Sequence, residues 1–141
     1  MSSTNLDLVG SIRAAWERGD FSSSDWAHPE IEFAVVGGPS PGAWTGLADM
    51  AEAMRDFFSA WEGFRVEADD FRELDGERVL VLVHMSGRGK TSGLELEEMR
   101  AKAAELFHIR AGKVTRLVLY TERELAFADL GLSSEAGSSG S

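Results

Sequence analysis

The chain has 141 residues, of which 43% are apolar, so it can form one domain with a substantial core but hardly two. Its 24 acidic residues against 14 basic ones give a net charge of −10, which argues against nucleic acid or an anionic membrane surface as a partner. Cysteine is absent, which excludes disulfides, thiolate metal sites and a thiol nucleophile. No signal-peptide pattern opens the sequence and no run approaches the ~20 apolar residues of a membrane span, so we expect a cytoplasmic protein.

The N-terminal half of the sequence predicts three helices. Apolar residues at helical spacing predict one helix over residues 5–18 and a stronger one over residues 47–61, and a short helix is expected over residues 24–27. Residues 37–42 contain three glycines and two prolines, which predicts a loop.

Strands dominate the rest of the chain. Alternating apolar residues predict a first strand over residues 31–35. An Asp-Gly turn and an Ala-Gly turn each separate two further strand patterns, as in antiparallel hairpins. The strands of these hairpins are expected at residues 64–74, 79–85, 106–110 and 114–120, before a short terminal helix at residues 122–130.

Residues 97–105 are ambiguous. The segment is rich in helix formers, and Leu96, Met99, Ala103 and Leu106 would suit one helical face. Read at period two, the same segment places Glu105 on one side of a strand. The pattern alone supports either structure.

The stretch from Gly89 to Ser92 reads Gly-Lys-Thr-Ser and superficially suggests a phosphate-binding loop. That motif requires a glycine at position 84, where this chain has a histidine, and no helix is expected to follow. We interpret the stretch as the end of a strand, where glycines suit a bulge.

The order of the predicted elements resembles the nuclear transport factor 2-like superfamily, and in particular its SnoaL-like branch. The segments that carry this resemblance are ERGDF at 17–21, HPEIEF at 28–33, WTGLADM at 44–50, GRGKTSG at 87–93, RAGKVTRLVLYTERELA at 110–126 and LGL at 130–132. Members with known chemistry include ketosteroid isomerases, polyketide cyclases, dehydratases and epoxide hydrolases.

The resemblance implies an α+β cone, in which a curved mixed sheet wraps a long helix and leaves a pocket open at one end. It also implies that Met99–Arg110 forms a strand and that the protein is a homodimer through the outer face of its sheet, where Leu106 and Val118 are expected. The domain is predicted to span residues 5–132, followed by a disordered Ser/Gly-rich tail at 133–141.

Glu105 is the first candidate catalytic residue. In the strand reading it is the only charged residue on an apolar face, where desolvation would raise the pKa of its carboxyl. By resemblance, it matches the strand position where ketosteroid isomerases carry a protonated aspartic acid. The alternative is a solvated glutamate at a sheet edge or on a helix.

His84 is the second candidate catalytic residue. Its alternation with Leu80 and Leu82 matches the pocket-facing positions of the family, so a His84–Glu105 pair could act as acid and base. The alternative is a half-exposed histidine at a strand end. The isomerases' general base and tyrosine fall at Ala34 and Ile12 of this chain, which argues against steroid isomerisation.

Candidate ligand-binding residues are apolar and mainly aromatic. Each of them could equally belong to the core, since an apolar helical stripe is core more often than ligand site. The resemblance places Trp44 in a loop near the pocket mouth. The predicted set is Trp16, Trp44, Met54, Phe58, Leu82 and Phe107.

No metal-ligand spacing, nucleophile motif or cofactor motif is visible in the sequence. The sequence therefore predicts a protein that binds a small, largely apolar organic molecule, without metal or cofactor. Acid–base catalysis of a cyclisation, isomerisation or hydration would fit Glu105 and His84. The alternative is a non-catalytic ligand-binding or accessory dimer of the same fold.

Overall fold

The structure of the protein is a computed structural model that describes residues 4–18, 20, 25–37, 41–59, 61–89 and 98–132. Within these ranges, the side chains of residues 57–59, 61–64, 88–89 and 98–101 are not described. The elements in chain order are α1 (Thr4–Glu17), β1 (Ala27–Val36), β2 (Gly42–Thr45), α2 (Leu47–Ser59), β3 (Trp61–Asp75), β4 (Arg78–Gly89), β5 (Glu98–Arg110), β6 (Lys113–Tyr120) and α3 (Arg123–Leu130).

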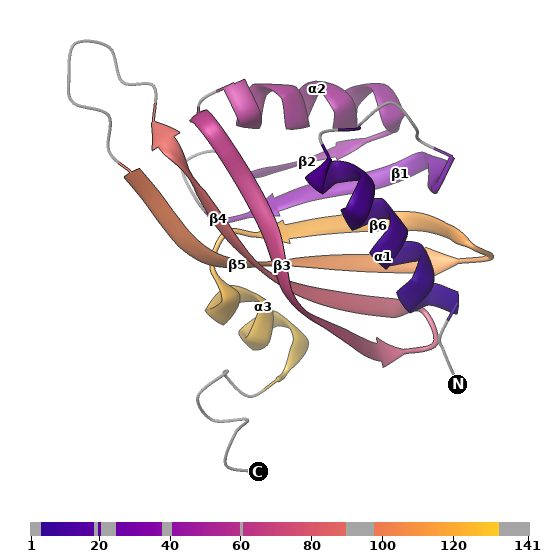
Figure 1. Cartoon of the computed structure of the whole chain (residues 1–141). Helices are drawn as coiled ribbons and strands as arrows, with labels where there is room; N and C mark the ends of the chain where they lie inside the picture. Colours follow the sequence, from indigo (N-terminus) through magenta and orange to yellow (C-terminus); the bar gives the residue numbers. More distant parts are fainter. Residues whose placement is uncertain are drawn as a thin grey trace.

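The six strands form one open, curved, mixed sheet in the order β2-β1-β6-β5-β4-β3. Only β1 and β6 pair in parallel, and the other neighbours are antiparallel. The long strands β3 and β4 curl around one side of the sheet, and α1 crosses in front of it (Figure 1). This is the α+β cone that the resemblance implied.

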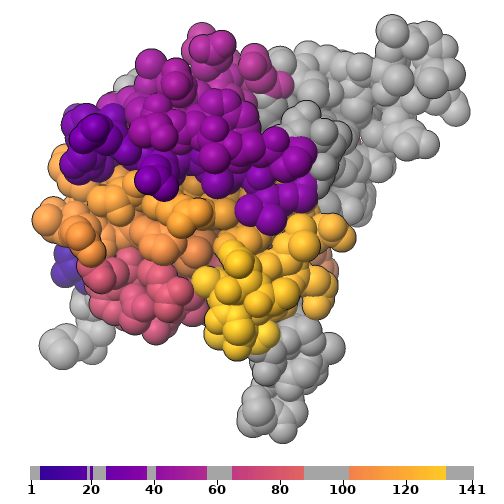
Figure 2. Space-filling model, turned by 180° about the vertical axis from the view of Figure 1, so that it is seen from behind, coloured from indigo at the N-terminus to yellow at the C-terminus, as the bar shows by residue number. Residues whose placement is uncertain are grey.

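The sheet has an inner face, which packs against α1 and α2, and an outer face, which packs against α3. The inner core joins Val9 and Ile12 of α1 and Met50 of α2 to Val81 and Phe107 of the sheet. The outer core joins Ala126 and Phe127 of α3 to sheet residues such as Leu82 and Leu106. Figure 2 shows this second side, with α3 in yellow against the orange strands β5 and β6. Because side chains alternate along a strand, each sheet position belongs to one of these two faces.

The ambiguous segment is a strand: β5 runs from Glu98 to Arg110 and pairs with β4 along its whole length. Ladder hydrogen bonds and burial between two strands outweigh the helical propensity of its alanines and glutamates. The strand reading is therefore confirmed.

Two local predictions were wrong. Asp25 and Trp26 form a turn rather than a helix, and Ala27 already belongs to β1, where it pairs with Val114. The long helix ends at Ser59, and residue 61 begins β3. In each case pairing with a neighbouring strand overrides the local helical pattern. Residues 90–97 of the glycine-rich stretch and the tail at 133–141 lie outside the described residues.

None of the helices in the described part of the chain is both long and apolar enough to cross a membrane.

Candidate active site

Glu105 lies in the middle of β5 on the inner face of the sheet. Its cross-strand neighbours are apolar, Val81 on β4 and Leu119 on β6, and only 7% of its surface is exposed. Burial raises the pKa of the Glu105 carboxyl above its ordinary value of 4.5, because desolvation penalises the charged form. The positive charge of Arg13 opposes this shift and the negative charge of Glu17 adds to it.

Arg13 is the residue that covers Glu105, and we did not predict it. It is 2% exposed although it belongs to a surface helix. Its Nη1 donates to Glu105 Oε2 at 3.3 Å, while its Nη2 donates to Glu17 Oε2 at 3.2 Å and to the backbone oxygen of Val66 at 2.6 Å. One guanidinium thus joins α1 to both β3 and β5.

Arg13 did leave a signal in the sequence. It lies four residues after Val9 and three before Trp16, which places it inside the apolar stripe of α1 rather than on its polar side. A charge at such a position is rarely buried without a partner, and Glu105, the acidic residue on the apolar face of the sheet, was the natural candidate.

The pair between Arg13 and Glu105 is incomplete. Within the described part of the chain, Arg13 Nε and Glu105 Oε1 are both buried and have no hydrogen-bond partner. A buried polar atom left unpaired costs about 1–3 kcal/mol. Because folded proteins rarely tolerate this, a bound water or a ligand group is needed to complete the pair.

Aromatic rings surround this pair. The guanidinium of Arg13 lies 5.6 Å from the ring centre of Trp16, within the range of a cation–π contact. The centre of the Trp16 ring is 6.1 Å from the centre of the Phe107 ring. It is 5.6 Å from the centre of the Trp26 ring, and these two rings pack edge to face. Phe107 shares the inner face with Glu105, two residues along β5. Trp16 and Phe107 thus lie on the same side of the sheet as Glu105, and their role in ligand binding stays a prediction.

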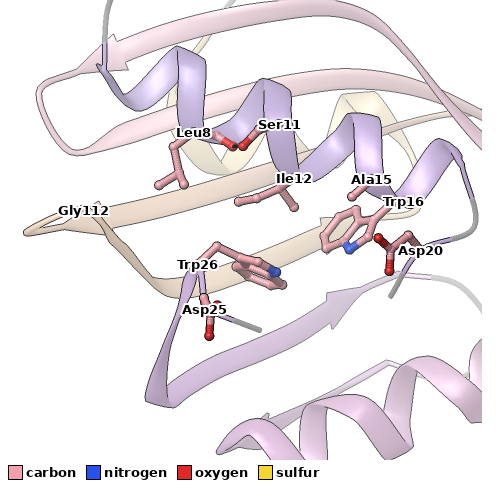
Figure 3. Close-up of a pocket in the computed structure, with 9 residues that line it drawn as sticks. All are labelled: Leu8, Ser11, Ile12, Ala15, Trp16, Asp20, Asp25, Trp26 and Gly112. Atoms are coloured by element: carbon pink, nitrogen blue, oxygen red, sulfur yellow. Dashed lines mark hydrogen bonds between the residues drawn. The ribbon is translucent and has the colours of Figure 1, made fainter. Parts of the chain in front are cut away.

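A cavity of about 340 Å³ opens beside Trp16, between α1, the start of β1 and the turn between β5 and β6. Figure 3 shows the neighbouring Trp16 and Trp26 rings among the residues that line it. Its wall is apolar along α1, and Asp20 and Asp25 contribute carboxylates. The volume is at the lower end of the range for small-molecule sites, about 300–1,000 Å³. Its lining residues are Leu8, Ser11, Ile12, Ala15, Trp16, Asp20, Asp25, Trp26 and Gly112.

His84 does not meet Glu105. The register pairs Glu105 with Val81, so residue 84 lies on the opposite face of the sheet, and the predicted His84–Glu105 pair is not formed. Instead, His84 Nδ1 lies 2.7 Å from Asp69 Oδ1, and 44% of its side chain is exposed. The error came from assigning the Leu80–Leu82–His84 side of β4 to the pocket, whereas that side packs toward α3.

His84 belongs to a polar network on the outer face. Asp69 also accepts a hydrogen bond from Nη2 of the buried Arg123 at 2.5 Å. Arg123 further donates to the backbone oxygens of Ala103 and Val83, at 3.2 and 3.0 Å. Burial is the largest single influence and opposes ionisation of Asp69, but the hydrogen bonds from His84 and Arg123, together with the charges of these residues, outweigh it and lower the pKa of the Asp69 carboxyl. The network fastens the first turn of α3 to β3, β4 and β5.

The other predicted ligand residues are spread over the molecule. Leu82 is buried on the outer face in the core beneath α3, so it does not line the inner pocket as expected. Trp44 lies in β2 rather than in a loop, and its ring packs 5.7 Å from Phe33. Met54 is half-buried against the inner core, and the side chain of Phe58 lies outside the described residues.

Among the described residues, no three His, Cys, Asp or Glu side chains gather as a possible set of metal ligands. Among the described residues near α1, the carboxyl of Glu105 and the guanidinium of Arg13 are the buried groups with chemistry to offer, while Glu17 contacts Arg13 and Asp20 and Asp25 line the cavity. Together the buried carboxyl and guanidinium can donate hydrogen bonds to an oxygen and exchange one proton.

Several known proteins share this fold. TerC, crystallised with polyporic acid, is 22% identical, with a TM-score of 0.71 over 91% of this chain and 98% of that chain. An NTF2-like protein from Burkholderia thailandensis E264 is 20% identical, with a TM-score of 0.74 over 92% and 98% of the two chains. A protein with a ketosteroid isomerase-like fold from Catenulispora acidiphila DSM 44928, in complex with trimethylamine, is 15% identical, with a TM-score of 0.65 over 90% and 94%.

No curated protein matches the sequence. A family model described as the SnoaL-like domain matches residues 9–117, a range that includes Arg13, Trp16 and Glu105. This match covers most of the chain and agrees with the fold, so the chain belongs to the SnoaL-like domain family.

Proposed function

We propose that the protein binds a small, largely apolar organic molecule between α1 and the inner face of the sheet, with Glu105 as its acid–base group. The observation that carries this proposal is the incomplete Arg13–Glu105 pair, in which Arg13 Nε and Glu105 Oε1 are buried without a partner. The cavity that Trp16 and Trp26 line supplies an apolar surface for the ligand. Arg13 and Glu105 are not among its lining residues, and Trp16, whose ring centre lies 5.6 Å from the guanidinium of Arg13, connects the cavity to the pair.

The chemistry we propose is proton transfer without a cofactor. Because the pKa of Glu105 is raised, its neutral carboxyl persists to higher pH than that of a solvated glutamate, and it can give a proton to a ligand oxygen or carbon. Arg13 Nε would donate a hydrogen bond to the oxygen on which negative charge develops. Cyclisation, isomerisation and hydration all need a step of this kind.

A second candidate function is ligand binding without catalysis. It is favoured by the position of His84, which leaves Glu105 without the histidine partner that an acid–base pair would use. In this case the unpaired atoms of Arg13 and Glu105 would only orient a polar group of the ligand.

We further propose that the protein acts in the cytoplasm as a homodimer through the outer face of its sheet. A cysteine-free chain has no need of an oxidising compartment. Leu106 and Val118 are covered within the monomer, so a partner would meet exposed residues of that face such as Glu32 and Arg116. Light scattering of the purified chain measures the mass that decides between monomer and dimer.

Binding is tested by filling the cavity. Ala15 lines it, whereas the preceding Ala14 is exposed on the same helix, so Ala15→Phe and Ala14→Phe are matched variants. Planar aromatic ketones and phenols serve as probes, with quenching of tryptophan fluorescence as the measurement. We expect saturable binding that Ala15→Phe weakens at least about tenfold, which corresponds to 1.4 kcal/mol. Equal affinity in both variants would contradict the proposed site.

Catalysis is tested on the probes that bind. Glu105→Gln keeps the shape of the side chain and removes its proton transfer, while Glu124→Gln removes an exposed carboxylate on α3, which packs against the opposite face of the sheet. If the protein is an enzyme, turnover falls in Glu105→Gln by about 10²–10⁴, the usual contribution of a general acid or base, and persists in Glu124→Gln. Binding without turnover in the wild type would establish the second function.

A further inference from the structure

Arg13 is shared between two carboxylates of different exposure. Its Nη1 contacts the buried Glu105, and its Nη2 contacts Glu17, whose side chain is 41% exposed at the last residue of α1. The two contacts are of similar length, 3.2 Å to Glu17 and 3.3 Å to Glu105. The guanidinium therefore does not belong to Glu105 alone.

Glu17 is held in this position by the sheet. Its Oε2 also accepts a hydrogen bond from the backbone nitrogen of Ala68 on β3, at 3.3 Å. The backbone oxygen of Val66, two residues earlier on β3, accepts from the same Nη2 of Arg13. Strand β3 thus fixes both the guanidinium and its second carboxylate, so the charge of Glu17 stays close to Arg13.

Contact between Arg13 and Glu105 is weaker than the two side chains allow. An arginine and a carboxylate commonly form two parallel hydrogen bonds of about 2.7–2.9 Å. Here one bond of 3.3 Å joins them, and Arg13 Nε and Glu105 Oε1 are left over. This geometry is what a guanidinium drawn toward β3 would give, by the Val66 backbone oxygen at 2.6 Å and by the charge of Glu17 at 3.2 Å.

We propose that Glu17 is a positioning residue, which draws Arg13 away from full pairing with Glu105 and so keeps Glu105 neutral and able to give its proton. The inference rests on the proposed function of Glu105. Glu17 and Arg13 together carry no net charge, so an ionised Glu105 would add an uncompensated negative charge to a buried site. The cross-strand neighbours of Glu105, Val81 and Leu119, supply no opposite charge.

The electrostatics at Glu105 support the same reading. Its pKa is raised first by burial and is also raised by the charge of Glu17, whereas Arg13 lowers it. Without Glu17, both the repulsion and the competition for Arg13 would be lost, and each loss favours the ionised form of Glu105.

The test is the pKa of Glu105, followed by the chemical shift of its carboxyl carbon through a pH titration of the full chain. Glu17→Gln removes the competing charge, Glu17→Asp keeps the charge but shortens its reach, and Glu124→Gln removes an exposed carboxylate elsewhere. We expect the pKa of Glu105 to fall in Glu17→Gln beyond the fitting error, to fall less in Glu17→Asp and to stay unchanged in Glu124→Gln. An unchanged or raised pKa in Glu17→Gln would overturn the inference.

The amide spectrum of each variant reports whether the fold is kept, so a merely structural role of Glu17 is separable from an electrostatic one. The outcome is also separable from the proposed function. If the protein binds the probes but the pKa of Glu105 is unchanged in Glu17→Gln, only the proposed role of Glu17 is contradicted. A lowered pKa in a protein that binds none of the probes would support the role of Glu17 and count against the ligand site.

Discussion

Two buried arginines hold helices to the two faces of the sheet, and they differ in how completely they are paired. Arg123 fastens α3 through two backbone oxygens and Asp69, whose other carboxylate oxygen contacts His84. Arg13 fastens α1 in a similar way, through Val66 and two carboxylates, but its Nε and one oxygen of Glu105 have no partner in the described structure.

The difference separates a structural network from a candidate functional one. On the outer face both oxygens of Asp69 are occupied and the carboxylate is partly solvated, so its charge is stable. On the inner face Glu105 is desolvated and only one of its carboxyl oxygens has a hydrogen-bond partner among the described residues, which favours the neutral carboxyl that can donate a proton. A buried polar group that lacks one partner can accept that partner from a ligand.

The largest expected effect is the loss of Arg13. Arg13→Met removes the donor that Glu105, Glu17 and Val66 share and leaves these acceptors without it, which should lower the free energy of unfolding at pH 7 by about 3 kcal/mol. Urea denaturation measures this change. Replacing both Arg13 and Glu105, as Arg13→Met with Glu105→Leu, should restore part of the loss, since no buried carboxyl is then left without its donor. The exposed Arg18→Met serves as control, and an equal loss there would contradict the account.

Loss of the other buried arginine should affect stability but leave the site intact. Arg123→Met removes hydrogen bonds to Ala103, Val83 and Asp69, and should cost about 2 kcal/mol. Hydrogen exchange should show the loss concentrated in α3. The pKa of Glu105 should stay as in the wild type, because the sheet separates the two networks. A change in that pKa would show that the two faces are coupled.

The pH dependence of stability should distinguish Glu105 from the other carboxylates. Its folded pKa lies above the ordinary value of 4.5, so its contribution is fully present below that pH and is lost as the pH rises through the raised value. Glu105→Gln stays neutral, so the unfolding free energy of this variant should increase relative to that of the wild type as the pH rises above 4.5. Parallel curves for the two proteins would mean that the folded pKa of Glu105 is not raised.

The smallest effect is expected at His84. Its side chain is 44% exposed and its contact with Asp69 lies near the surface, so His84→Asn should change the free energy of unfolding by no more than about 1 kcal/mol. Probe affinity should be unchanged, because His84 lies on the outer face. A tenfold loss of probe affinity in His84→Asn would indicate that His84 lies in the binding site, which would contradict the pairing register of β4 and β5.

Sequence patterns located most of the fold because its strongest signals are local. The helical stripe of α1 and the Asp-Gly turn between β3 and β4 are both properties of a few consecutive residues. Strand β5 shows the limit, since its composition favours a helix and only its two neighbouring strands make it extended. The turn before Ala27 was missed for the same reason.

The site was predictable only in part. The buried position of Glu105 was predicted because a charge on an apolar strand face is rare and its period-two position is explicit in the sequence. Its partner Arg13 is 92 residues away, and their contact depends on how α1 crosses the sheet. His84 was assigned to the wrong face because alternation identifies two faces of a strand but does not say which of them is covered by α3.

The measurement that tests the central claim most directly is the pKa of Glu105 in the wild-type protein, from the carbon shift of its carboxyl between acid and neutral pH. The account predicts a value clearly above 4.5, because the carboxyl is desolvated and only half-paired with Arg13. A value at or below 4.5 would show either a solvated side chain or a complete ion pair. Either result would remove Glu105 as the proton donor and contradict the proposed chemistry.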